Sequence, residues 1–161
     1  MTRAHRQSGF SMIEVLVALL VLAIGLLGLA MLQGQGLKFN THAYTRTQAT
    51  TLAYDILDRM RANPSGVGNG FYDVPSQSAA QAAIDAFAAC KTGACDCTQS
   101  VCDSANLAKY DLGLWYEMQG TLLPQAAGNL STVERSGTQV TVTIRWHENG
   151  VVKSQQWIAE L

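Results

Sequence analysis

The stretch that decides the fold reads VLVALLVLAIGLLGLAML and runs from Val15 to Leu32. These eighteen residues carry no charge and no strongly polar side chain. Because an α-helix rises ~1.5 Å per residue, the stretch and its flanks can cross a hydrocarbon core about 30 Å thick. We therefore predict a membrane-spanning helix near the N-terminus.

Charged residues on either side of this stretch predict its orientation. Arg3, His5 and Arg6 precede it, and the next cation along the chain is Lys38. Basic residues hold the preceding side of a first span in the cytoplasm, so we expect the chain beyond residue 37 to face outward. The apolar stretch exceeds the ~7–15-residue core of a secretory signal peptide, and no A-x-A-like cleavage site follows it. Retention in the membrane is therefore favoured over removal of the helix.

The eight residues that lead into this stretch read SGFSMIEV, from Ser8 to Val15. They resemble the processing site of type IV pilins and pseudopilins, in which a short basic leader ends in Gly, the first mature residue is commonly Phe and the fifth is Glu. The resemblance implies a leader at Met1–Gly9 and cleavage after Gly9 by a prepilin peptidase. It also implies N-methylation of the new first residue, Phe10, and makes Glu14 the fifth mature residue.

Glu14 is a carboxylate at the start of an apolar helix. At the bilayer centre such a charge costs on the order of 2.5–3.5 kcal/mol, which favours a partner charge; the alternative is that Glu14 lies near the interface and reaches water. The resemblance implies that Glu14 pairs with the Phe10 ammonium of a neighbouring subunit in a filament. Because unpaired charges in hydrocarbon are expensive, this pair would favour one axial register between subunits.

Apolar residues continue at helical spacing beyond the membrane stretch. Their i, i+3, i+4, i+7, i+8 and i+11 pattern predicts an amphipathic helix over 37–63 with one buried stripe: Ala49, Leu52, Ala53, Ile56, Leu57 and Met60. Asp55 and Arg59 form an i,i+4 pair in the favourable orientation. Asn63-Pro64 ends the helix, because the residue before Pro avoids the helical region. We expect one helix from Phe10 to Ala62, with 10–36 as its membrane and filament-core half.

Residues 64–161 are expected to form an α+β head in which the long helix packs on a small antiparallel sheet. The Gly-, Pro- and Ser-rich segment 64–78 is interpreted as a variable loop. An Ala-rich helix capped by Ser78 and ending at Cys90 should follow it. Alternating apolar residues predict a buried strand over 107–118: Tyr110, Leu112, Leu114, Tyr116 and Met118.

The C-terminal segment predicts a β-hairpin. Apolar residues alternate with polar ones from Val140 to Trp146, and Asn149-Gly150 is a strong signal for a two-residue turn. This turn places Glu148 opposite Val151, Trp146 opposite Lys153 and Val142 opposite Trp157. We expect the two tryptophans and the valines to cover the long helix; a binding platform built on Trp146 and Trp157 is the less favoured alternative.

Four cysteines lie close together, at Cys90, Cys95, Cys97 and Cys102. An even number in a domain that faces an oxidising compartment predicts two disulfides. Pairing Cys95 with Cys97 is least favourable because so small a ring strains the bond geometry. Two arrangements remain open: 90–95 with 97–102, or 90–97 with 95–102. A four-thiolate zinc site is the minor alternative, since such sites usually show C-x2-C pairs.

The rest of the sequence does not point to catalysis. His42 and His147 have no neighbouring Ser or Cys elbow and no metal-ligand spacing, so we expect both to be solvent-exposed. The glycines at 66–70 lack the preceding strand and following Lys-Ser/Thr of a phosphate-binding loop. Net charge is −1 and there is no basic block, so nucleic acid is not a favoured partner. We expect no enzymatic activity, no cofactor and no metal site.

A second segment narrows the resemblance within the pilins. The residues from Leu52 to Asn63 read LAYDILDRMRAN, and together with the preceding apolar helix they resemble minor pilins of the pilus-modification (PilV) type. This resemblance covers about a third of the chain. It implies a single-pass inner-membrane protein with a periplasmic head that enters a type IV pilus. The implied partners are other minor pilins, the major pilin, the prepilin peptidase and the inner-membrane assembly platform.

Three alternative functions remain open. The same N-terminal chemistry fits a pseudopilin of type II secretion or of DNA uptake. A pilus-tip adhesin that binds a ligand through its head is the third possibility.

Overall fold

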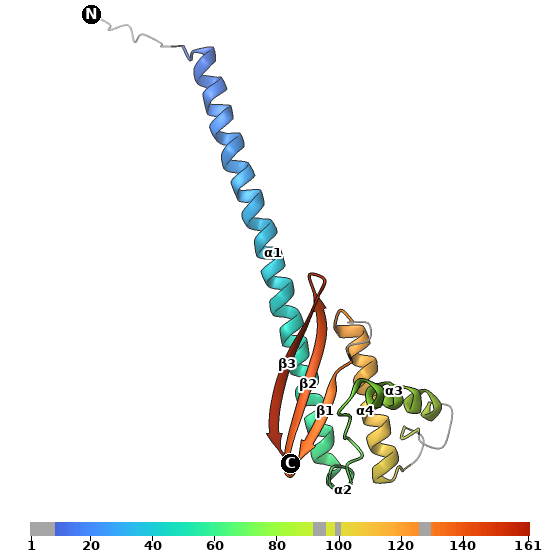
Figure 1. The fold of residues 1–161 in the computed structure, drawn as a ribbon. Coiled ribbons are helices and arrows are strands. Elements are labelled where there is room, and N and C mark those ends of the chain that lie inside the picture. Colours follow the sequence, from blue (N-terminus) through green and yellow to red (C-terminus); the bar gives the residue numbers. More distant parts are fainter. Residues whose placement is uncertain (1–8, 92–95, 99–100, 126–129) are drawn as a thin grey trace, which may run out of the picture. The chain divides into compact units, whose positions relative to one another are not determined.

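The computed structural model describes residues 9–91, 96–98, 101–125 and 130–161 (Figure 1). The chain divides into two compact units, Met1–Thr41 and His42–Leu161, and each is described by itself. Residues 1–8 of the expected leader and Cys95 lie outside the described residues. Helix α1 runs from Met12 to Ala62, so it starts two residues after the expected Phe10 and ends where the sequence predicts.

The first unit contains the apolar part of α1. Its most apolar window of eighteen residues has a mean hydropathy of 3.0, and none of that window is buried. Among the described residues, α1 is the one helix long and apolar enough to cross a membrane. A helix that is apolar all round and has no protein around it belongs in lipid or in the interior of an assembly.

In the second unit, α1 supplies one wall of the core. The predicted stripe from Ala49 to Met60 is buried, with every member at most 2 % exposed. The helix ends at Ala62, because Pro64 follows and Asn63 leaves the helical region. The predicted amphipathic pattern is therefore confirmed.

Three antiparallel strands form one sheet in the order β1-β2-β3. They are β1 (Thr132–Ser136), β2 (Gln139–Glu148) and β3 (Val151–Glu160). The β2–β3 register pairs Glu148 with Val151, Trp146 with Lys153 and Val142 with Trp157, so the predicted hairpin is confirmed. Figure 1 shows the sheet beside the His42–Ala62 part of α1. With the long helix, this sheet confirms the α+β class.

The segment expected to be a loop over 64–78 contains a short helix, α2 (Pro64–Gly68). Pro is favourable at the first helical position, and the Asn63 side chain caps the helix by accepting from the Gly66 N–H, 3.1 Å away. Helix α3 runs from Gln77 to Cys90 and is capped by Ser76, not by the expected Ser78. The Ser76 hydroxyl oxygen accepts from the Ala79 N–H, and Ser78 hydrogen-bonds to Ser76 instead.

The predicted strand over 107–118 is wrong, because this segment lies in helix α4 (Ser104–Leu122). The buried residues follow helical spacing and not alternation: Ala108, Asp111, Leu112, Gly113, Trp115, Tyr116 and Gln119. The Asp103 side chain caps the helix by accepting from the Asn106 N–H, 2.7 Å away. A strand would bury only every second residue and would leave Trp115 on the outer face.

Candidate processing and assembly site

The expected processing site lies at the start of the first unit. Gly9 and Phe10 precede α1, and the Phe10 side chain is 83 % exposed. Apart from its chain neighbours, no described residue has an atom within 4 Å of the position that a Cβ would take at Gly9. The Ser11 carbonyl accepts from the N–H groups of Glu14 and Val15 and so starts the helix. The Gly9–Phe10 bond therefore lies before the helix, where no described residue outside its own segment covers it.

Glu14 lies in the first turn of α1 and is exposed. A carboxylate in this position is favoured by the unpaired N–H groups of the helix start. Along the helix, Glu14 borders a shallow apolar groove lined by Phe10, Val15, Ala18, Leu19 and Leu22. One negative charge thus stands at the head of an otherwise apolar surface, a pattern that can attract a cation on another helix.

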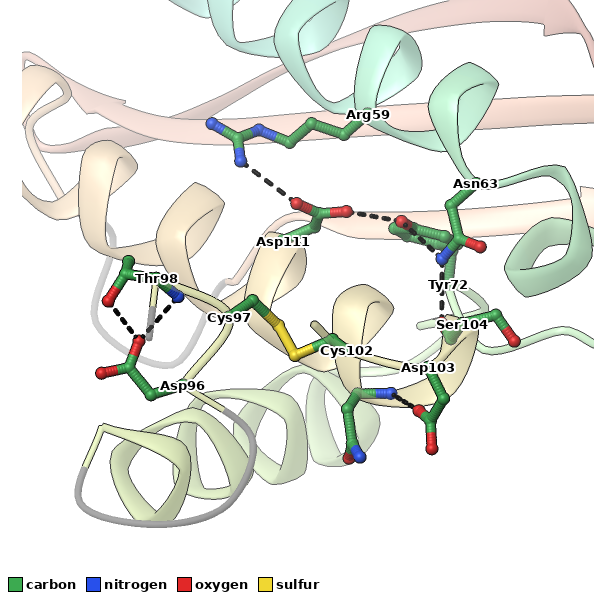
Figure 2. The surroundings of a disulfide bond; sticks show 11 residues. Arg59, Asn63, Tyr72, Asp96, Cys97, Thr98, Cys102, Asp103, Ser104 and Asp111 are labelled. Atoms are coloured by element: carbon green, nitrogen blue, oxygen red, sulfur yellow. Dashed lines mark hydrogen bonds and ion pairs between the residues drawn. A yellow bond between two sulfur atoms is a disulfide. The ribbon is translucent and has the colours of Figure 1, made fainter. Parts of the chain in front are cut away.

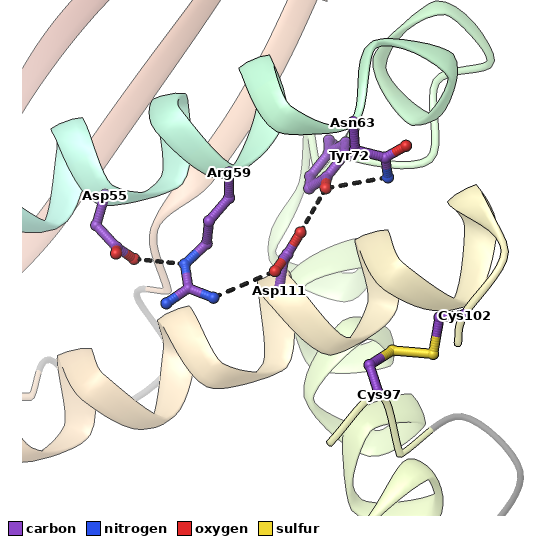
Figure 3. A network of polar contacts seen from close by, with 7 residues as sticks. All are labelled: Asp55, Arg59, Asn63, Tyr72, Cys97, Cys102 and Asp111. Atoms are coloured by element: carbon purple, nitrogen blue, oxygen red, sulfur yellow. Dashed lines mark hydrogen bonds and ion pairs between the residues drawn. A yellow bond between two sulfur atoms is a disulfide. The ribbon is translucent and has the colours of Figure 1, made fainter. Parts of the chain in front are cut away.

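The second unit contains a polar network that crosses its core (Figure 3). Arg59 on α1 donates from Nε to Asp55 Oδ2 at 2.8 Å and from Nη1 to Asp111 Oδ1 at 3.2 Å. Asp111 on α4 is only 6 % exposed. Burial lowers the pKa of the Arg59 guanidinium, but the hydrogen bonds and charges of Asp55 and Asp111 outweigh burial and raise it overall. The predicted i,i+4 pair is confirmed, and it extends to α4.

Tyr72 and Asn63 complete this network. The Tyr72 hydroxyl donates to Asp111 Oδ2 at 2.6 Å, and Asn63 Nδ2 donates to Tyr72 Oη at 3.2 Å and to the Ser104 carbonyl at 2.8 Å. Burial, and then the hydrogen bond to Asp111, raise the pKa of Tyr72. The network ties the end of α1 to the start of α4, so it positions elements and leaves no reactive group free.

A disulfide joins Cys97 to Cys102, with its Cα atoms 5.5 Å apart (Figure 2). Of the two arrangements that the sequence left open, this bond belongs to the one that pairs 90 with 95 and 97 with 102. It excludes a bond between Cys90 and Cys97. Cys90 is also disulfide-bonded. The Cys97–Cys102 bond lies directly before the Asp103 cap of α4. On the other side, the Asp96 carboxylate accepts from the Thr98 backbone and hydroxyl, which lowers the pKa of Asp96.

Metal-binding clusters are missing from the part of the chain that the structure describes. No cluster of three His, Cys, Asp or Glu side chains there could hold a metal ion. The expectation that both histidines are simply solvent-exposed is wrong. His147 is half-buried, and His42 Nδ1 lies 2.8 Å from Glu148 Oε1 at the hairpin turn.

Sequence reasoning missed Asp111, Tyr72 and the contact of His42 with Glu148. Asp111 is separated from Arg59 by 52 positions along the chain, so no local pattern links them. The available signal was the Asp103 cap followed by helical spacing, which would have placed Asp111 on a buried helix face and raised the question of its partner.

Two family models match the chain. The prokaryotic N-terminal methylation motif matches residues 4–30, which include Gly9, Phe10 and Glu14. The model of type IV pilin Tt1218 matches residues 31–113, more than half of the chain. No curated protein and no solved structure matches it significantly. These matches confirm the type IV pilin-like resemblance and indicate a structural subunit. The chain belongs to the type IV pilin Tt1218 family.

Proposed function

We propose that this chain is a minor pilin that supports initiation or assembly of a type IV pilus. The observation that carries the proposal is the combination of the methylation motif at 4–30 with an apolar helix that none of the described residues covers. A helix of this kind can be stored in the membrane and can later pack against the helices of other subunits. The segment LAYDILDRMRAN at 52–63 supports the minor-pilin class through its resemblance.

In this proposal a prepilin peptidase cleaves after Gly9 and methylates the amino group of Phe10. The open backbone around Gly9 and the exposed Phe10 support access by a peptidase. The basic leader stays in the cytoplasm and the head faces the periplasm. The periplasm is oxidising, and this favours disulfides such as Cys97–Cys102.

Glu14 has the assembly role in this proposal. Its carboxylate pairs with the Phe10 ammonium of a neighbouring subunit. Because the surrounding helix surface is apolar, sliding the helices by one turn would separate the two charges in a medium that penalises both. The pair therefore selects one register.

The first test is the intact mass of the protein extracted from the membrane. We expect loss of Met1–Gly9 and gain of one methyl group in the wild-type chain. Gly9→Val should retain the leader and abolish incorporation into pili. Normal cleavage and normal piliation of Gly9→Val would refute the proposal.

The second test compares two changes of the same chemistry. Glu14→Gln should be processed but should fail to enter pili, because the amide cannot neutralise an ammonium. Glu160→Gln, which removes a carboxylate from exposed β3, is the matched control and should assemble normally. Equal assembly of the two variants would contradict the role of Glu14.

Identification of the binding partners tests whether the chain belongs to a type IV pilus, a type II secretion system or a DNA-uptake system. Capture of the detergent-extracted full chain should recover other minor pilins, the major pilin and platform proteins. Recovery of secretion components or of DNA-uptake components would instead assign the chain to a pseudopilin of that system. Recovery of a host ligand through the head alone would favour the adhesin alternative.

A further inference from the structure

The end of the β2–β3 hairpin contacts α1 through a small polar cluster within the second unit. His42 Nδ1 lies 2.8 Å from Glu148 Oε1, and the Trp146 indole N–H donates to Glu148 Oε2 at 3.2 Å. On the other side of the ring, His42 Nε2 lies 3.4 Å from Asn149 Nδ2. Both ring nitrogens of His42 are therefore engaged by the two residues at the turn.

The hairpin geometry fixes Glu148 but leaves the turn itself exposed. Trp146 is 2 % exposed in the core, so its indole holds one carboxylate oxygen in place. Beyond it, Asn149 and Gly150 have positive φ values of 53° and 76°, as a tight two-residue turn requires. The turn residues and Val151 are exposed. The polar contacts with His42 join this end to α1, and the His147 N–H joins it to the Pro124 carbonyl.

We propose that His42 and Glu148 form a pH-dependent latch that fastens the hairpin turn to α1 more tightly in mild acid. A neutral ring can donate from Nδ1 to Glu148 and accept at Nε2 from Asn149. A protonated ring adds a full positive charge beside the carboxylate and donates from both nitrogens, so Asn149 presents its amide oxygen instead. The inference is independent of the proposed role in a pilus.

The charges around the ring support this direction. From β2, Glu148 is the charged group in contact with the ring, and Asn149 is uncharged. Lys38 and Arg46, one turn away on α1, are exposed, so salt screens their charges. On β3, the cation is Lys153, which lies opposite Trp146 in the register. His147 follows Trp146 and points to the other face of the sheet.

The latch should strengthen in mild acid, because a protonated ring places a full positive charge beside the Glu148 carboxylate. The two side chains are 28 % and 23 % exposed, so the effect is modest. We expect hydrogen-exchange protection of residues 148–152, corrected for intrinsic rates, to rise about two- to fivefold between about pH 7.5 and 5.5.

The test uses the ¹⁵N-labelled full chain in detergent micelles. The Trp146 indole resonance, assigned with Trp146→Phe, should move with pH together with protection of the turn. The Trp115 indole, which donates to the Leu52 carbonyl inside the core, should stay fixed and reports an intact fold. The latch is refuted if, in the wild-type chain, neither the protection of the turn nor the Trp146 indole resonance changes with pH while the Trp115 resonance shows an intact fold.

Four variants make the result specific. Glu148→Gln and His42→Gln should abolish the pH response of the turn. His147→Gln is the matched control and should retain it, because the contact of His147 with Pro124 uses its backbone N–H. Asn149→Asp keeps a residue suited to the turn and adds a second carboxylate beside the ring, so the response should grow. A response that persists in Glu148→Gln, or disappears in His147→Gln, would refute the assignment.

Discussion

The ring of Phe87 on α3 lies directly against the backbone of Gly113 on α4. A Cβ atom at Gly113 would overlap Cβ, Cγ and Cδ2 of Phe87. Because the overlap includes the Phe87 Cβ, a rotation of the ring cannot relieve it. The glycine therefore sets how closely α3 and α4 approach, and Tyr110 packs edge-on against the same ring with a centroid distance of 5.6 Å.

Gly113→Ala should lower the free energy of unfolding by about 1–3 kcal/mol, the usual effect of overpacking a core. Gly120→Ala is the matched control on the same helix, since nothing lies within 4 Å of its Cβ position. There the change should stabilise by about 0.5–1 kcal/mol through helix propensity. Thermal unfolding of the two variants in the same detergent measures the difference. Equal midpoints would show that α3 and α4 can separate at no cost.

Asp111 should be the most sensitive member of the polar network. Asp111→Ala leaves the Arg59 charge with one partner fewer and the Tyr72 hydroxyl without its acceptor, so we expect a loss of about 2–4 kcal/mol. Asp55→Ala, at the more exposed end of the network, should cost ~1 kcal/mol or less.

A double-mutant cycle between Arg59 and Asp111 measures their coupling by chemical denaturation. We expect a coupling energy of about 0.5–3 kcal/mol, because the two side chains share one network. Additive effects of the two single changes would contradict a direct interaction.

Alkaline pH should destabilise the head through Tyr72 and Tyr116. Burial raises the pKa of both, aided at Tyr72 by Asp111 and opposed at Tyr116 by the charge of Arg145. A phenol in the unfolded chain ionises near pH 10, so the stabilisation is complete below that value. Above it the unfolded chain loses protons that the folded chain keeps. Stability should then fall by about 1.4 kcal/mol per pH unit for each tyrosine.

Denaturant unfolding between about pH 9 and 11 checks this sign and slope. Tyr72→Phe and Tyr116→Phe each remove one titrating phenol. Each variant should therefore reduce the slope of the unfolding free energy against pH by about 1.4 kcal/mol per pH unit. Tyr54→Phe, a change at an exposed position on α1, is the control and should leave the slope as it is. A slope unchanged in both buried variants would mean that other groups control the alkaline response.

The parts of the fold that could be predicted from the sequence are those with local signals. The stripe on α1, its end at Asn63-Pro64 and the hairpin register around Asn149-Gly150 depend on neighbouring residues, and all are confirmed. Strand β1 was not predicted from the sequence, because it has only five residues. It is joined to β2 by a turn in which Gly137 has a φ of 63°.

Helix α4 was misread because a polar residue interrupts its buried face. Asp111 occupies a core position, and it is acceptable there only because Arg59 and Tyr72 reach it from elsewhere in the chain. Without those partners in view, the alternating apolar residues around Leu112 favoured a strand. The contact of His42 with Glu148 was hidden for the same reason, since it joins residues more than 100 positions apart.

The Cys97–Cys102 bond should hold the segment in front of α4. Replacing both residues by Ser opens a six-residue ring, and chain entropy predicts a loss of about 2 kcal/mol. The loss should be local, because the bond ends one residue before the Asp103 cap whose carboxylate accepts from the Asn106 N–H. Hydrogen exchange should therefore accelerate first at residues 104–108, while the β2–β3 pairing stays protected.

Asp103→Ala tests the cap alone and should cost ~1 kcal/mol with both cysteines present. Unchanged exchange at 104–108 in the double-serine variant would show that the cap, and not the disulfide, fixes the start of α4.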